Sequence, residues 1–177
     1  MGIDNGFFGK TASIGRPVTL RYLPAIGGRR VTALDISGWL HKVARAIDPV
    51  AASVHGDYSA AVAEIEKRLY LLYGQGLEVW AVFDGAEHAA KQRADTKRRE
   101  KRERAQTELD ALMVRQRGGE LGLDALIYSA ASRAIRRTDA YNTLLKSALD
   151  KNGFGFEVAP FEADSQLAYL ALTGKVA

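Results

Sequence analysis

The sequence contains no cysteine, which excludes disulfides, thiolate zinc sites and cysteine nucleophiles. It has no apolar run near the roughly 20 residues that a membrane helix needs, so we expect no membrane contact. The first residues, MGIDNGFFGK, lack a basic segment followed by an apolar one, and we expect no secretory signal. A hydrophobic content of 47% over 177 residues instead indicates one globular domain with enough material for a sizeable core.

Several common catalytic patterns are also missing. The three histidines, His41, His55 and His88, do not have the spacing of metal ligands. The sequence has no G-x-S-x-G elbow, no Walker A pattern and no G-x-G-x-x-G fingerprint after a strand. These absences argue against serine hydrolases of the elbow type, P-loop NTPases and dinucleotide-binding enzymes.

Positive charge is concentrated in one segment. Residues 91–104 carry eight basic and three acidic side chains, a net charge of +5, against +4 for the whole chain. A local patch of this kind suggests a polyanionic partner, with nucleic acid the first candidate. The alternative is a solvated helix whose charges pair at i,i+4 spacing. The basic residues are Lys91, Arg93, Lys97, Arg98, Arg99, Lys101, Arg102 and Arg104.

Short apolar segments alternate with segments of helical periodicity. Strands are expected at residues 31–37, 77–83 and 154–160, with a fourth beginning in TGKVA at residues 173–177. Helices are expected at residues 38–47, 58–73, 87–117, 123–151 and 162–172. This alternation predicts a three-layer α/β/α fold with a mainly parallel sheet. The first half of the 87–117 helix has almost no apolar stripe, so we expect it to stand away from the core.

A carboxylate lies at the end of each expected strand. The first strand ends at Asp35, Asp84 follows the second, and Glu162 and Asp164 follow the third. Sites in open α/β sheets lie outside the carboxyl ends of the strands, so we expect these acids at one edge. Each also has a plain structural explanation, as a helix cap, a turn or a favourable charge at a helix N-terminus. Four carboxylates at one edge repel one another unless cations lie between them, and Mg²⁺ suits such oxygen ligands.

Carboxylates that hold Mg²⁺ beside a basic helix would form a coherent site for phosphodiester chemistry. The ions would activate water and stabilise the leaving oxygen, and the basic helix would bind the phosphates. A competing interpretation is an aspartyl phosphotransferase with Asp35 as nucleophile. Such sites commonly need a second acid two residues later, where this chain has Ser37.

Three segments, ALDISGWLHK, VFDG with its following basic helix, and VAPFEADSQLAYL, resemble the flap-endonuclease superfamily of XPG-type structure-specific 5′ nucleases. WLHK and EADSQLAYL are most similar to its 5′-to-3′ exonuclease branch, and the resemblance covers nearly all of the chain. It implies a PIN-like nuclease fold with a basic helical arch at about residues 87–140. It also implies metal-dependent hydrolysis of DNA near 5′ ends or flaps, in repair or replication.

The resemblance implies roles for individual residues. Asp35, Asp84, Glu162 and Asp164 match carboxylates that bind two Mg²⁺ ions, for which Mn²⁺ is an alternative. Lys91 and Arg98 match a basic pair at the scissile phosphate. Gly2 matches a glycine near the active site, and His41 matches a ring near the terminal bases, unless it is a surface or packing histidine. The other basic residues expected to bind DNA are Arg93, Lys97, Arg99, Lys101 and Arg102.

Two expectations concern the chain as a whole. In the family further acids follow shortly after the position of Ala177, so we expect residues 1–177 to be an incomplete N-terminal nuclease domain, weakly active or inactive alone. The alternative is a nuclease-like module that binds nucleic acid without cutting it. The resemblance also implies a monomer that acts inside the cell, in the nucleus. Arg133, Arg136 and Arg137 would either add phosphate contacts or form a solvated helix face.

Overall fold

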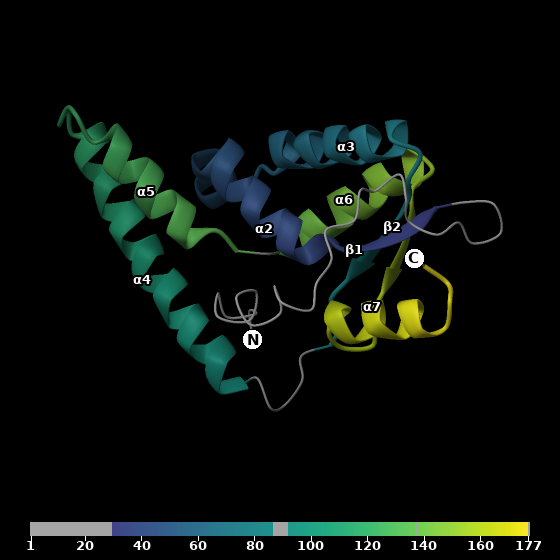
Figure 1. Ribbon diagram of the computed structural model, residues 1–177. Coiled ribbons are helices and arrows are strands. Elements are labelled where there is room, and N and C mark those ends of the chain that lie inside the picture. Colours follow the sequence, from purple (N-terminus) through teal and green to yellow (C-terminus); the bar gives the residue numbers. More distant parts are fainter. Residues whose placement is uncertain (1–29, 87–91, 137, 177) are drawn as a thin grey trace, which may run out of the picture.

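The computed structural model describes residues 30–86, 92–136 and 138–176 (Figure 1). Three parallel strands form one sheet in the spatial order β1-β2-β3. The expected alternation of strands and helices is confirmed. In chain order the elements are β1 (Val31–Asp35), α2 (Ile36–Ile47), the π-helical turn η2 (Ala51–His55), α3 (Ser59–Gly74), β2 (Glu78–Phe83), α4 (Gln92–Arg117), α5 (Asp124–Ala134), α6 (Asp139–Lys151), β3 (Gly155–Val158) and α7 (Ala163–Leu172).

Helices cover both faces of the sheet, because successive residues of a strand point to opposite sides. In β2, Val79, Ala81 and Phe83 belong to the core formed with α2, α3 and α6. Trp80 and Val82 belong to a second core, formed with α7. Figure 1 shows α7 on one side of the strands and α3 and α6 on the other. The expected three-layer α/β/α architecture is confirmed.

The register of the sheet brings the carboxyl ends of its strands together. Asp35 at the end of β1 pairs with Val82, and Phe83 at the end of β2 pairs with Val158 at the end of β3. The residues that follow each strand therefore emerge along one edge. We call this edge, with the segments that leave it, the carboxyl edge.

Helices α4 and α5 form a pair that extends away from the sheet (Figure 1). Their contact is apolar and includes Leu109 of α4 and Ile127 of α5. No residue of α4 before Ala105 is buried in its described part, so the expectation that its first half stands away from the core is confirmed. The pair is attached to the rest of the protein through α5, where the hydroxyl of Ser53 donates to the carbonyl of Ala131 at 2.8 Å.

The single helix expected at residues 123–151 is wrong, because the structure has α5 and α6 there. Between them Ile135 is extended, with φ −50° and ψ 129°, and is buried in the main core. Thr138 is the N-cap of α6, since its side chain accepts a hydrogen bond from the backbone N–H of Tyr141 at 3.1 Å. The break lets the chain return from the helical pair to the sheet.

The fourth strand expected in residues 173–177 is also wrong for the part of them that the structure describes. Gly174 has a φ of 68°, a left-handed conformation in the turn that follows α7. Val176 is buried in the same core as α7, so its apolar character reflects packing and not a strand. The sequence also did not predict η2. No helix in the described part of the chain combines the length and apolar character that a membrane crossing requires.

We expect Gly155→Ala to destabilise the protein by about 1–3 kcal/mol, because overpacking of a core has a cost of this size. A Cβ at Gly155 would overlap the ring of Trp80, its partner on the neighbouring strand. Urea denaturation followed by circular dichroism measures the free energy of unfolding. Gly74→Ala is the matched control, because a Cβ at the end of α3 would meet no atom within 4 Å. Equal stabilities of the two variants would contradict the packing of Trp80 on Gly155.

Candidate active site

Asp35 is the last residue of β1 and the N-cap of α2. Its Oδ1 accepts a hydrogen bond from the backbone N–H of Gly38 at 3.2 Å. The capping role that the sequence left open is confirmed, and it holds the carboxylate at the carboxyl edge. An ionised carboxylate has about four acceptor positions, so the cap leaves room for a further ligand.

Asp84 connects the three parts of the carboxyl edge. Its backbone N–H donates to the hydroxyl of Ser37 at 3.1 Å, and its Oδ1 accepts from the backbone N–H of Ala163 at 2.9 Å. The second bond satisfies one of the N–H groups that a helix N-terminus leaves without a partner. Asp84 therefore ties β2 both to the start of α2 and to the start of α7.

Ser37 is a site residue that sequence reasoning missed. Its polar side chain is buried, with 6% of the residue exposed, and it lies in α2 directly beyond the end of β1. Its hydrogen bond reaches a residue 47 positions away, which leaves no pattern in the sequence. From the sequence, Ser37 is only the residue at the position where an aspartyl phosphotransferase commonly has its second acid.

The chain beyond β2 runs against the chain beyond β3. The backbone N–H of Gly85 donates to the carbonyl of Phe161 at 2.6 Å, and that of Ala86 donates to the carbonyl of Pro160 at 3.2 Å. A Cβ at Gly85 would overlap the carbonyl of Ala159. Glycine is required here because two backbones approach closely, which is a stricter demand than that of an ordinary turn.

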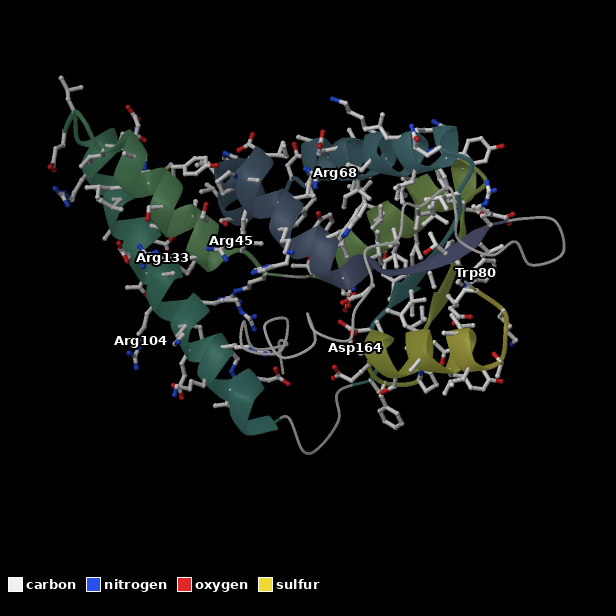
Figure 2. All side chains as sticks on the ribbon, in the orientation of Figure 1. Arg45, Arg68, Trp80, Arg104, Arg133 and Asp164 are labelled. Carbon is white, nitrogen blue, oxygen red and sulfur yellow. The ribbon has the colours of Figure 1, made fainter. Side chains whose placement is uncertain are left out.

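Glu162 and Asp164 lie at the N-terminus of α7, Glu162 as the N-cap residue and Asp164 in the first turn. Negative charge is favourable there, because a helix N-terminus carries a partial positive charge. Figure 2 shows Asp164 at the edge of the sheet where α7 begins. Asp164 is exposed, whereas Glu162 is half-buried and faces the cleft described next.

The charges of the acids act on one another. Burial raises the pKa of Asp35, the hydrogen bond from Gly38 lowers it, and the carboxylates of Asp84 and Asp164 raise it further, leaving it above its usual value. Asp84 in turn lines one cleft together with Glu162. The four acids therefore lie at or beyond the carboxyl ends of the strands, and of the four Asp84 and Glu162 line this cleft, whereas Asp35 and Asp164 do not.

A cleft of about 530 Å³ lies between the carboxyl edge and helix α4. Acids from the sheet side and arginines from α4 face the same space, the juxtaposition that the sequence predicted. The sheet side contributes Ser37, Asp84, Gly85, Ala86 and Glu162, and the helices and the segment between α5 and α6 contribute His41, Asp95, Arg98, Arg99, Arg102 and Arg136.

Some predicted DNA-binding residues lie away from this cleft. Lys97 is exposed and does not line it. Lys101 lines a neighbouring groove of about 580 Å³ between α2, α4 and α5. Gly2 and Lys91 lie outside the described residues, and so does the side chain of Arg93, which belongs to the first turn of α4.

Ion pairs on α4 also support the alternative interpretation of its charges, a solvated helix whose side chains pair with one another. Arg98 donates to Asp95 at 3.1 Å, and Arg99 lies 3.9 Å from Glu103. These are the i,i+3 and i,i+4 pairs of a solvated helix, and Asp95, Arg98 and Arg99 also line the cleft. Pairing and phosphate binding are therefore not mutually exclusive for this segment.

The three arginines at the end of α5 and directly after it have different surroundings. Arg133 forms an ion pair with Glu108 of α4 at 2.8 Å. Arg136 lines the cleft, and its carbonyl accepts a hydrogen bond from the hydroxyl of Tyr58 at 2.7 Å. The ring of Tyr58 stacks on Tyr141 with centroids 4.1 Å apart, which holds this part of the chain against the core. Arg137 lies outside the described residues.

The donor chemistry of the carboxyl edge fits a hard divalent cation, because its ligands are carboxylate oxygens. Within residues 30–86, 92–136 and 138–176, no three histidine, aspartate or glutamate side chains lie close enough to hold one ion together. Mg²⁺ in proteins commonly takes one or two carboxylates and completes its shell with water and phosphate. The residues therefore fit ions that keep several waters, and not a closed protein cage.

A family model described as the XPG N-terminal domain matches residues 1–105, which is more than half of the chain. The chain therefore belongs to the XPG N-terminal domain family. Exonuclease 1 of Xenopus laevis is 33% identical over 142 residues, covering 80% of this chain and 18% of that protein. Flap endonuclease 1 of Drosophila grimshawi is 32% identical over 152 residues, covering 84% of this chain and 37% of that protein. The chain thus spans well under half the length of these relatives.

Solved structures of the catalytic core of Rad2 in complex with DNA substrate have a similar fold. One has a TM-score of 0.64 at 19% identity and covers 97% of this chain and 42% of that chain. Another has a TM-score of 0.61 at 20% identity, with 97% and 43% covered. The expected XPG-type resemblance and nuclease-type α/β fold are confirmed. The relatives are flap endonucleases and an exonuclease, which supports a family of structure-specific 5′ nucleases.

We expect Asp35→Asn to raise the melting temperature at pH 7 and to change it little near pH 3. A raised pKa means that the folded protein holds this proton more tightly than the unfolded chain, so stability falls as the pH rises from about 3.8 through the folded pKa. Asparagine removes the charge and keeps the acceptor for Gly38. Calorimetry between pH 3 and pH 8 measures the difference.

Asp57→Asn is the control with the opposite sign. Hydrogen bonds from the backbone and side chain of Ser59 lower the pKa of Asp57, so its ionised form favours the folded state. This substitution should not raise the melting temperature at pH 7. A lower melting temperature for Asp35→Asn than for the unmodified protein at pH 7 would contradict the raised pKa that burial and the neighbouring carboxylates give Asp35.

Proposed function

We propose that this chain is the N-terminal part of the nuclease domain of a metal-dependent 5′ nuclease that hydrolyses DNA phosphodiesters near 5′ ends or flaps. The observation that carries the proposal is the cleft in which Asp84 and Glu162 of the carboxyl edge face the arginines of α4. Acids that hold cations and arginines that hold phosphates are the two requirements of phosphodiester hydrolysis assisted by metals. Membership of the XPG N-terminal domain family supports the same activity.

The four acids would hold two Mg²⁺ ions, with Mn²⁺ as an alternative: Asp35, Asp84, Glu162 and Asp164. Bound ions would supply an activated water and neutralise charge on the leaving oxygen. The protein itself fixes two of these carboxylates through backbone N–H groups, those of Gly38 and Ala163. Carboxylates held in this way keep their positions against mutual repulsion before any ligand arrives.

The basic residues would hold the DNA strand. Arg98, Arg99, Arg102 and Arg136 face the cleft and can donate to phosphate oxygens, for which the guanidinium fork is well suited. His41, from α2, faces the same cleft and offers a flat ring to a terminal base. We extend the proposed DNA contacts to Gly2, Lys91, Arg93, Lys97 and Lys101, on the family resemblance and the charge of the segment.

A second candidate is a nuclease-like module that binds DNA without cutting it. It is favoured by the finding that, in the described part of the chain, no three acidic or histidine side chains converge on one point. The two candidates differ in one measurement, which is cleavage of bound DNA by the unmodified full-length protein when Mg²⁺ is added. For either candidate we propose a monomer that acts on DNA in the nucleus.

In the full-length protein, we expect Asp84→Asn to lower Mg²⁺-dependent cleavage of a flapped DNA by at least about 100-fold, since even indirect partners of a metal are worth 10–100-fold. DNA binding in EDTA should change by less than about threefold, because a carboxylate contributes no attraction to phosphate. Asparagine keeps the Oδ1 acceptor for Ala163, so the fold is preserved.

Asp150→Asn is the control for the loss of one negative charge. Asp150 is exposed near the end of α6, which precedes β3 and therefore lies at the opposite edge of the sheet. Its cleavage rate should equal that of the unmodified protein. Undiminished cleavage by Asp84→Asn would refute the metal-site assignment, and DNA binding without cleavage by the unmodified full-length protein would favour the non-cutting module.

A further inference from the structure

Arg98 has an anionic partner inside the cleft in which we propose that it binds phosphate. Its Nη1 donates to Oδ1 of Asp95 at 3.1 Å, one turn earlier on α4. Both residues line the cleft together with Asp84 and Glu162. Asp95 therefore differs from the acids of the carboxyl edge, because it projects from the basic helix itself.

The carboxylate of Asp95 and a phosphate oxygen would compete for the same donor. Guanidinium groups bind carboxylates and phosphates through the same charge-assisted N–H···O bonds. A phosphate that approaches Arg98 from the cleft must either displace Asp95 or remain beside its negative charge. Each course weakens the attraction of Arg98 for the strand.

The ion pair is of the kind that a phosphate can displace. The side chains of Arg98 and Asp95 are 49% and 32% exposed, so water screens their attraction. Pairs with this exposure are individually weak. The competition should therefore reduce affinity by a small factor and not abolish binding.

We propose that Asp95 is an internal competitor for the phosphate-binding guanidinium of Arg98, and that it lowers the affinity of the cleft for DNA strands that no other group holds. This inference rests on the proposed function, since it concerns the same phosphate. A DNA strand that also contacts the other arginines of the cleft displaces Asp95, whereas a DNA strand held by Arg98 alone does not. Asp95 thus acts on selectivity and has no part in bond cleavage.

The test compares Asp95→Asn with a matched loss of charge on the same helix. Asp110→Asn serves as the control, because Asp110 is exposed and bonded to Gln106. It lies about 22 Å further along α4, at 1.5 Å per residue. That distance is about twice the Debye length of roughly 10 Å at 0.1 M salt, so its charge does not reach the cleft.

Fluorescence anisotropy with a 5′-flapped oligonucleotide in EDTA measures the dissociation constant at several salt concentrations. Asp95→Asn should bind about two- to fivefold more tightly at low salt, the range expected from one exposed ion pair. The plot of the logarithm of its binding constant against the logarithm of the salt concentration should be steeper by up to about 0.7, the value for one phosphate of single-stranded DNA. Asp110→Asn should match the unmodified protein, and an Asp95→Asn that does the same would overturn the proposal.

A double-mutant cycle separates competition from a general change of charge. In an Arg98→Ala background, Asp95→Asn should no longer alter the affinity, because the contested donor is gone. An undiminished effect in that background would also overturn the proposal.

Tripolyphosphate, an anion without base or sugar, keeps this inference distinct from the proposed function. If the protein fails to bind DNA at any salt concentration, the proposed function fails. Tighter tripolyphosphate binding by Asp95→Asn than by Asp110→Asn would still establish the competition, and equal binding would refute it.

Discussion

The burial of charge at the carboxyl edge, together with repulsion between its carboxylates, is the constraint on which the rest of this structure depends. Parallel strands deliver Asp35 and Asp84 to the same edge, and the charge of Asp164 reaches Asp35 as well. The protein offsets this repulsion with hydrogen bonds to backbone N–H groups, from Gly38 to Asp35 and from Ala163 to Asp84. The same hydrogen bonds therefore cap α2 and α7 and hold the two carboxylates in place.

The helical pair places the opposite charge at a distance. Its own apolar core, which includes Leu109 and Ile127, is separate from the cores on the two faces of the sheet. The basic half of α4 can therefore stand across a cleft from the acids and does not pack onto them. The hydrogen bond from Tyr58 to the carbonyl of Arg136 holds the returning segment at the side of that cleft. Opposite charges therefore face each other across a cleft of about 530 Å³.

Much of the fold could be predicted because its signals are local. Periodicity and turn residues located the strands β1, β2 and β3 and the basic helix, and the charge pattern placed that helix outside the core. The two wrong predictions, a single helix at residues 123–151 and a fourth strand at residues 173–177, also came from local patterns. Thr138 is an ordinary N-cap inside a long apolar pattern, and Val176 looks like a strand residue although it packs as a single buried side chain. The sequence alone cannot tell this cap from a continuing helix, or this buried valine from a strand residue, because both depend on where the chain turns in space.

The sequence by itself determined which carboxylates follow the strands and which helix carries the basic charge, because both depend on residues close to one another along the chain. Only the tertiary structure decided that Ser37 holds the backbone of Asp84, that Gly85 must lack a side chain, and that Arg136 joins the cleft. It also decided that Asp95 faces the acids and not the solvent side of α4. These features depend on contacts between distant segments, and the packing of three layers creates them.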